Sequence, residues 1–379
     1  MAVVAVVTDD LVLVDQHCHG VVAEDLDCAR FSALLTESSI ATNSFDSLLG
    51  LAVRRWCAPQ LGLPAHCSAD DYLERRAEWG WRRVSSQLLG SVGVGSWVLD
   101  TGLSEPGTPL TEPTDFADIA HGATFEVLRL ESVAERVAAG QPDVVDFLNS
   151  VEVEIRAAIE AGAVGLKSVV AYRTGLDLPA EPPTDVEVAA AASAWLRWGG
   201  TRLDDPILLA WLVHLGARLS AELHVPLQLH TGFGDDDVRL HRADPSLLGD
   251  FLHATKSTGA TIALLHTWPF HRNAGYLAHV FPHVLVDVGL AVPYVGDRAG
   301  AVLAELLELA PFASVCFSSD GYGLPELHHL GATLWRRALG RLIDGWLADD
   351  VMTAADGDRF AFNFAAGNCC RAYGLTPPG

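Results

Sequence analysis

The chain has 379 residues, 50% of them hydrophobic, and carries a formal net charge of −23. A chain of this size and composition can bury a large core, so extended disorder is not expected. The negative charge repels phosphate backbones and anionic lipid headgroups, which argues against nucleic-acid and membrane-surface partners. The net charge does not exclude a small anionic substrate, because arginines at the site itself would determine whether such a substrate binds.

The N-terminal segment and the cysteines indicate the cellular compartment of the protein. Met1–Val7 is apolar, but no basic residue precedes it and Asp9 and Asp10 follow, which predicts an ordinary first segment rather than a signal peptide. We expect no stretch apolar for long enough to span a bilayer. The seven cysteines form no C-x-x-C pair, and their odd number suits reduced thiols. These features predict a cytoplasmic protein.

Short apolar runs alternate with longer helical patterns, which is typical of a parallel sheet with right-handed crossovers. The candidate strands are Leu11–Gln16, Ser96–Asp100, Thr124–Arg129, Val164–Val170, Pro226–His230, Thr261–His266, Val284–Val288 and Ser314–Ser319. The helical patterns between them include Val133–Ala161, Asp185–Glu222, Ser246–Thr255 and Ala299–Leu309. Eight strands favour a closed (β/α)8 TIM barrel over an open sheet, and no G-x-G-x-x-G follows the first strand.

Two connections are longer than a minimal barrel requires. Residues from about 26 to 89 are mostly helical in pattern, and we interpret them as an insertion over the carboxyl end of the barrel, where loops build active sites. Ser104–Asp118 is rich in Pro, Thr and acidic residues and is predicted to be a surface loop. We therefore expect residues 1–379 to form a single barrel with this insertion, and a symmetric homo-oligomer remains open.

The first candidate strand leads into Asp15-Gln16-His17-Cys18-His19. Alternate residues share one face of a strand, so the imidazoles of His17 and His19 point the same way at its carboxyl end. Neutral imidazoles bind several divalent metals well. An H-x-H pair alone is a weak signal, and two hydrogen-bonded structural histidines explain it equally well.

Ligand-type residues recur at the ends of three other candidate strands, where His230, His266 and Asp320 stand. In a barrel all these ends meet at one face, and polar groups there are costly to bury without partners. The recurrence predicts a shared divalent metal, with zinc as the first candidate and manganese or iron as alternatives.

This set of residues resembles the amidohydrolase superfamily: H-x-H on the first strand, His on the fifth and sixth, Asp on the eighth. Three segments more closely resemble the amidohydrolase domains fused to glutamine-synthetase-like ligases, namely VGLKSVVAYRTGL at 164–176, LLHTWPF at 264–270 and CFSSDGYGLPE at 316–326. The resemblance covers nearly the whole chain from His17 onwards. It implies that the metal ligands are His17, His19, His230 and Asp320, with His266 as a further ligand or an electrophilic helper.

Lys167 in the fourth strand has several interpretations. Some superfamily members carboxylate a lysine in this strand to bridge two metals, whereas others keep it and bind one. A lysine in an apolar strand can also snorkel or pair with a carboxylate. We favour one metal, with Lys167 near the site as a charge or hydrogen-bond donor.

A mechanism follows from these parts. A divalent ion lowers the pKa of bound water towards ~7. Asp320 is expected to take the proton and pass it to the leaving group, and His266 to stabilise the oxyanion. The predicted catalytic residues are therefore Asp320, His266 and Lys167.

Substrate contacts are predicted after the fourth strand, at Tyr172 and Arg173. Arginine suits bidentate contact with a carboxylate, although a surface salt bridge explains Arg173 nearly as well. His271 and Arg272 are weaker candidates of the same kind. Further along, the pair His328-His329 is expected at the surface, and Asp235–Asp237 in a solvated loop.

Three functions remain open. The first is hydrolysis of a C–N amide bond, for which the ligase-linked resemblance implies γ-glutamyl amides as substrates. The second is decarboxylation of a small acid on the same metal barrel. The third is a non-catalytic metal-binding sensor, which the intact ligand set disfavours.

Overall fold

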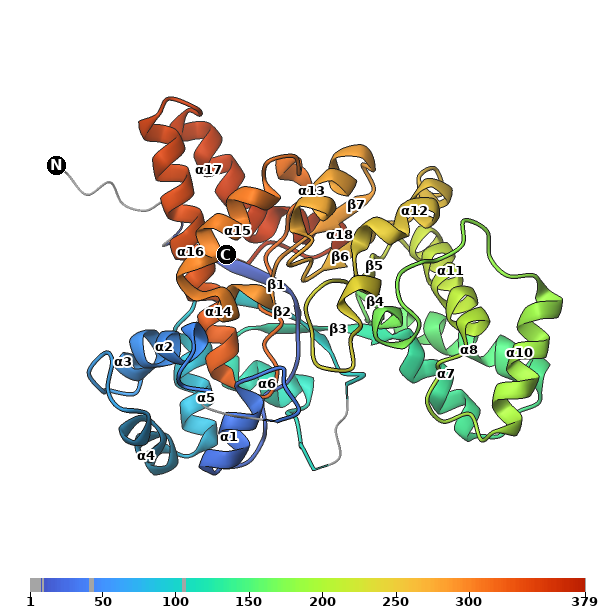
Figure 1. Cartoon of the computed structure of the whole chain (residues 1–379), viewed down its shortest axis with the longest axis horizontal. Helices are drawn as coiled ribbons and strands as arrows, with labels where there is room; N and C mark the ends of the chain where they lie inside the picture. Colours follow the sequence, from blue (N-terminus) through green and yellow to red (C-terminus); the bar gives the residue numbers. More distant parts are fainter. Residues whose placement is uncertain (1–7, 9, 41–43, 104–106, 379) are drawn as a thin grey trace.

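The computed structural model describes residues 8, 10–40, 44–103 and 107–378, so the predicted N-terminal segment 1–7 lies outside the described part (Figure 1). Its centre is one parallel sheet whose strands follow chain order. The strands are β1 (Leu13–Cys18), β2 (Val94–Asp100), β3 (Ala123–Arg129), β4 (Gly165–Ser168), β5 (Leu227–His230), β6 (Ile262–Leu265) and β7 (Val284–Val286).

The segment 315–320 closes this sheet into a barrel. Val315 forms a parallel bridge with Val286, and the Cys316 amide donates to the Val286 carbonyl at 3.0 Å. On the other side, the Gln16 amide donates to the Phe317 carbonyl at 3.0 Å. The eighth segment therefore lies between β7 and β1, and the predicted (β/α)8 barrel is confirmed.

Burial explains why the strands are apolar runs. Every residue of β1 and of β4 to β7 is buried, as in a parallel sheet covered on both faces. The register places Arg129 beside Lys167 and Lys167 beside Gln228 across β3, β4 and β5. A row of polar side chains thus crosses an otherwise apolar wall.

Two of the predicted long helices are each divided in two. The pattern at 133–161 forms α7 (Leu130–Ala139) and α8 (Val144–Glu160), and Pro142 and the N-cap Asp143 separate them. The pattern at 185–222 forms α10 (Asp185–Arg197) and α11 (Pro206–Leu223). Gly199 and Gly200 between these helices have φ values of +95° and +56°, which favour glycine.

The described part of the predicted insertion is helical. It contains α1 (Cys28–Leu34), α2 (Leu48–Ala52), α3 (Ala58–Gln60), α4 (Ala69–Trp79) and α5 (Trp81–Gly90), which gather on one side of the barrel in Figure 1. A buried ion pair ties α4 to α16 (Pro325–Ala348), with Arg76 Nε 2.8 Å from Glu326 Oε1. The Tyr72 hydroxyl donates to the same carboxylate at 2.9 Å.

Shorter helices complete the crossovers: α6 (Pro113–Ala120), α9 (Val170–Arg173), α12 (Gly249–Thr255), α13 (His271–Val280), α14 (Ala291–Val295) and α15 (Ala299–Leu306). The chain continues through α16 into α17 (Ala354–Phe362) and α18 (Asn368–Tyr373). This last helix packs against β1, and its Cys369, Cys370 and Tyr373 join an apolar cluster with strand residues such as Val14 and Val98.

By length and composition α11 could cross a membrane, so the expectation that no stretch reaches that length and apolarity is wrong. However, 56% of this window is buried inside the protein. The helix packs against β4 and β5. These contacts account for its apolar character, as in the core helices of soluble proteins.

Candidate metal centre

Asp320 stands at the centre of a buried cluster at the carboxyl ends of the strands. Its Oδ1 lies 3.3 Å from His17 Nε2 and 3.5 Å from His19 Nε2, and its Oδ2 lies 3.3 Å from His266 Nδ1. These residues come from β1, the end of β6 and the eighth segment. The barrel therefore brings together side chains that are far apart in sequence.

Two sets of ligand atoms are close enough to share an ion. The atoms of His17, His266 and Asp320 lie within 4.8 Å of one another, as do those of His17, His19 and Asp100. Asp100 is already engaged, because Arg129 donates to its Oδ2 from Nε at 3.0 Å and from Nη2 at 2.6 Å. The set built on Asp320 is the more available of the two.

The ring of His19 is oriented by the backbone. Its Nδ1 lies 2.9 Å from the carbonyl oxygen of Asp100, which can only accept a hydrogen bond. Nδ1 is therefore the protonated nitrogen, and Nε2 presents a lone pair towards Asp320. A lone pair on this nitrogen is what metal ligation requires.

Buried nitrogen atoms without partners show that the cluster fits a ligand. Among the described residues, His230 Nε2 and His266 Nε2 are buried and have no hydrogen-bond partner. The two rings lie 4.6 Å apart between centroids. Leaving such groups unsatisfied costs about 1–3 kcal/mol each. A divalent ion that accepts their lone pairs would remove this cost.

The electrostatics favour neutral imidazoles around a carboxylate. Burial lowers the pKa of His17 to about 4 and holds the pKa values of His230 and His266 well below the usual range. Burial alone would raise the pKa of Asp320, but His266, His17 and His19 outweigh it and keep that pKa well below its usual value. Metal ligands need these protonation states.

The backbone at the cluster is strained. His266, Thr267 and Asp320 have φ values of +70°, +29° and +49°, a region that residues other than glycine rarely adopt. Each such residue costs of order 1–3 kcal/mol and persists only where its surroundings hold it. Two buried carboxylates do so: Asp287 accepts from the His266 amide at 2.8 Å, and Asp15 accepts from the Ser319 amide at 3.0 Å.

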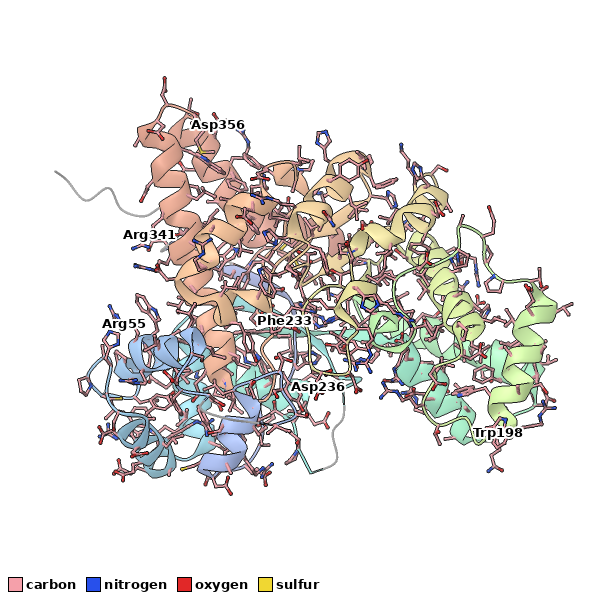
Figure 2. The ribbon with its side chains drawn as sticks, viewed as in Figure 1. Arg55, Trp198, Phe233, Asp236, Arg341 and Asp356 are labelled. Carbon is pink, nitrogen blue, oxygen red and sulfur yellow. The ribbon has the colours of Figure 1, made fainter. Side chains whose placement is uncertain are left out.

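A cavity of about 590 Å³ opens above the cluster. The insertion contributes residues between Arg30 and Ser39 to its wall. Asp236, also in the wall, lies near the middle of the molecule between the insertion and the green helices (Figure 2). Hollows of about 800 Å³ near Trp79 and Pro179 are larger, but no ligand cluster of the described residues lies in either.

Comparisons with known proteins agree with this geometry. No family model matches the sequence. The chain is 28% identical over 408 aligned residues to Protein fluG of Emericella nidulans; the match covers 97% of this chain and 46% of fluG, so the chain spans about half the length of that curated relative. A metal-dependent hydrolase from Lactobacillus casei superposes with a TM-score of 0.84 at 26% identity, covering 97% of this chain and 96% of that one.

A uronate isomerase from Bacillus halodurans superposes with a TM-score of 0.63 at 12% identity over 98% of this chain and 95% of its own, which shows the fold alone. The chain has the amidohydrolase fold. In this fold, the clustered histidines and Asp320 occupy the mouth of the barrel.

The predicted substrate and lysine positions lie at this mouth of the barrel. Tyr172 and Arg173 line the cavity, and the Tyr172 ring centroid is 4.5 Å from that of His230. Arg173 Nη2 lies 3.3 Å from Glu135, while its buried Nη1 has no hydrogen-bond partner among the described residues. Lys167 Nζ is 3.3 Å from His17 Nε2, and burial lowers its pKa to about 8 although Asp100 and Asp320 oppose this.

Some sequence predictions are wrong. His328 and His329 are buried, because the first turns of α16 are enclosed on all sides; His328 Nε2 lies 3.0 Å from the His19 carbonyl. His271 and Arg272 do not line the cavity and instead pair with Glu305 and Glu308. The loop at 235–237 is exposed, as predicted, and its three aspartates also form part of the cavity wall.

Several residues around the site were not singled out from the sequence. They are Asp15, Asp100, Arg129, Gln228 and Asp287, and all but Arg129 are buried. A signal was present, because each interrupts or ends an apolar strand. The pattern alone does not say which partner each residue meets.

Proposed function

We propose that the protein is a metal-dependent hydrolase that cleaves a C–N amide bond in a small substrate, with γ-glutamyl amides as the leading candidates. The observation that carries this proposal is the buried cluster of His17, His266 and Asp320, with unsatisfied imidazole nitrogens, beneath an arginine-lined cavity. A cation bound there would satisfy the unpaired nitrogens of His230 and His266 beside the ionised Asp320.

His17, His19, His230 and Asp320 would hold the ion, with His266 as a ligand or helper beside them. Zinc is the first candidate, and manganese or iron are alternatives. When bound, the ion polarises the amide carbonyl and acidifies a water molecule. The neutral imidazoles described above are already in the state that ligation needs.

Asp320 moves the proton in this scheme. Its depressed pKa keeps it ionised, so it accepts a proton from the attacking water and passes it to the leaving nitrogen. Lys167 and His266 face the same space and stabilise the negative charge that develops on the carbonyl oxygen. With a pKa of about 8, Lys167 is largely protonated at neutral pH.

The cavity offers both signs of charge. Arg129, Arg173 and Arg202 line it together with Glu37 and the acidic loop 235–237. A γ-glutamyl group carries a carboxylate and an ammonium, and each finds a complementary partner in such a wall. The volume of about 590 Å³ suits a small molecule. The resemblance to ligase-linked domains supports the same substrate class.

A direct test measures release of free amine from a panel of γ-glutamyl amides, with carbon dioxide release from small carboxylic acids measured in parallel. Amine release that stops on chelation supports the proposal. Carbon dioxide release without amine would favour the decarboxylase. Bound metal without turnover of any substrate would favour the sensor.

A further inference from the structure

Four buried side chains form a hydrogen-bonded set next to the candidate metal ligands. They are Gln16, Gln228, Asp287 and Tyr373, each at most 4% exposed, and we call them the glutamine network. They come from β1, β5, the end of β7 and the last helix α18. None is a proposed ligand, and the chemistry above gives them no role.

The orientation of Gln228 follows from its partners. Its Nε2 lies 2.8 Å from the Gln16 carbonyl oxygen and 2.7 Å from the Tyr373 hydroxyl. A backbone carbonyl only accepts hydrogen bonds, so the amide nitrogen, not the amide oxygen, must face it. The Gln228 side-chain oxygen therefore points the other way.

That oxygen favours the His17 tautomer that carries its hydrogen on Nδ1. Gln228 Oε1 lies 2.8 Å from His17 Nδ1, and an amide oxygen cannot donate. His17 Nδ1 must then carry the hydrogen, which leaves the lone pair on Nε2. This nitrogen faces Asp320 at 3.3 Å, and it can accept a hydrogen bond from the Lys167 ammonium, also at 3.3 Å.

The network continues to the other side of the cluster. The Tyr373 hydroxyl accepts from Gln228, so its own hydrogen is available for Gln16 Oε1 at 3.4 Å. Gln16 Nε2 in turn donates to Asp287 Oδ2 at 2.6 Å. Asp287 Oδ1 accepts from the strained His266 amide. A single network thus reaches two of the site histidines.

We propose that Gln228 is a positioning residue that fixes the metal-binding tautomer of His17, and that Tyr373 holds Gln228 in the required orientation. The inference rests on the proposed metal site. Residues that hydrogen-bond a ligand histidine typically change metal affinity by about 10–100-fold when they are removed. The effect is expected on metal binding itself, before any substrate is added.

The test uses Gln228→Met, which nearly preserves volume but removes the hydrogen bonds, and Tyr373→Phe. Tyr72→Phe is the matched control, because it removes a buried hydroxyl bonded to Glu326 outside the network. Zinc affinity is measured by competition with a chromophoric chelator. The tautomer of His17 is measured in metal-free protein by two-bond nitrogen–proton correlation on ¹⁵N-histidine samples.

In the wild type we expect His17 protonated on Nδ1. Gln228→Met should mix the tautomers and weaken zinc binding by about 10–100-fold. Tyr373→Phe should weaken it less, because the Gln16 carbonyl still holds the amide nitrogen. Tyr72→Phe should leave both readouts unchanged.

Three results would overturn the inference: wild-type zinc affinity in Gln228→Met, an unchanged tautomer in that variant, or an equal loss in Tyr72→Phe. If Gln228→Met does not fold, Tyr373→Phe decides by the same two readouts. Wild-type protein that binds no zinc, manganese or iron contradicts the proposed function instead. The tautomer measurement then still tests Gln228, because it needs no metal.

Discussion

Replacing Asp320 with asparagine isolates the proton transfer at the centre of the site. Asn keeps the shape and one acceptor oxygen, so contacts to the histidines at 3.3–3.5 Å are largely preserved. What is lost is the ability to take a proton. We therefore expect Asp320→Asn to abolish nearly all turnover while the metal stays bound.

The size of the loss follows from the surroundings. General acid–base catalysis contributes about 10²–10⁴-fold, or roughly 3–5 kcal/mol of activation free energy. We expect the upper part of this range, because Asp100, the carboxylate of the other ligand set, is held by Arg129 and cannot substitute.

The assay combines kcat for amine release with elemental analysis of metal per chain. Asp244→Asn is the matched control, since Asp244 lies outside the cluster and caps a short helix. Retained turnover in Asp320→Asn, with metal bound, would refute the role of Asp320. Loss of both metal and turnover would instead mean that Asp320 is needed mainly as a ligand.

Three further predictions concern binding and stability. Wild type is expected to bind roughly one ion per chain, and His230→Ala should lose it. Chelation should therefore lower the melting temperature of wild type more than that of the variant. Equal metal content in both proteins would contradict the ligand assignment. Arg173→Met should raise KM for an anionic substrate by about 10–100-fold, as expected for loss of a charge-assisted hydrogen bond. Arg272→Met should leave KM unchanged, and steady-state kinetics of the two variants test this difference. Arg76→Met leaves Glu326 buried without its cation, so denaturant unfolding should show a loss of about 3–5 kcal/mol, and a loss below that range would mean that Glu326 finds another partner.

The barrel could be predicted because its strands are apolar runs that end in ligand-type residues. His230 directly follows Pro226–Leu229, a run that is buried throughout β5 and contains Gln228 as its one polar residue. The helix boundaries were harder to predict from the sequence. The break at 140–143 depends on Pro142 and the cap of Asp143, which compete with a continuous apolar periodicity on either side.

Long-range contacts explain the remaining errors. His328 packs directly against Gly321, where an added Cβ would collide with the imidazole. The pairing of Asp100 with Arg129 depends on the register of β2 with β3. Sequence spacing contains neither fact, because both arise only when the sheet curls and closes.

The closing seam of the barrel has a consequence for dynamics. Between β7 and β1 the chain forms a bridge and a few hydrogen bonds, including that from the Asp320 amide to the His17 carbonyl at 3.0 Å. Local opening along this line would separate Asp320 from His17, so an ion bound by both residues would stabilise the closed barrel against such opening. We therefore expect amide hydrogen exchange to slow on metal binding at 315–320 and 16–19, while the β4–β5 wall opposite stays unchanged.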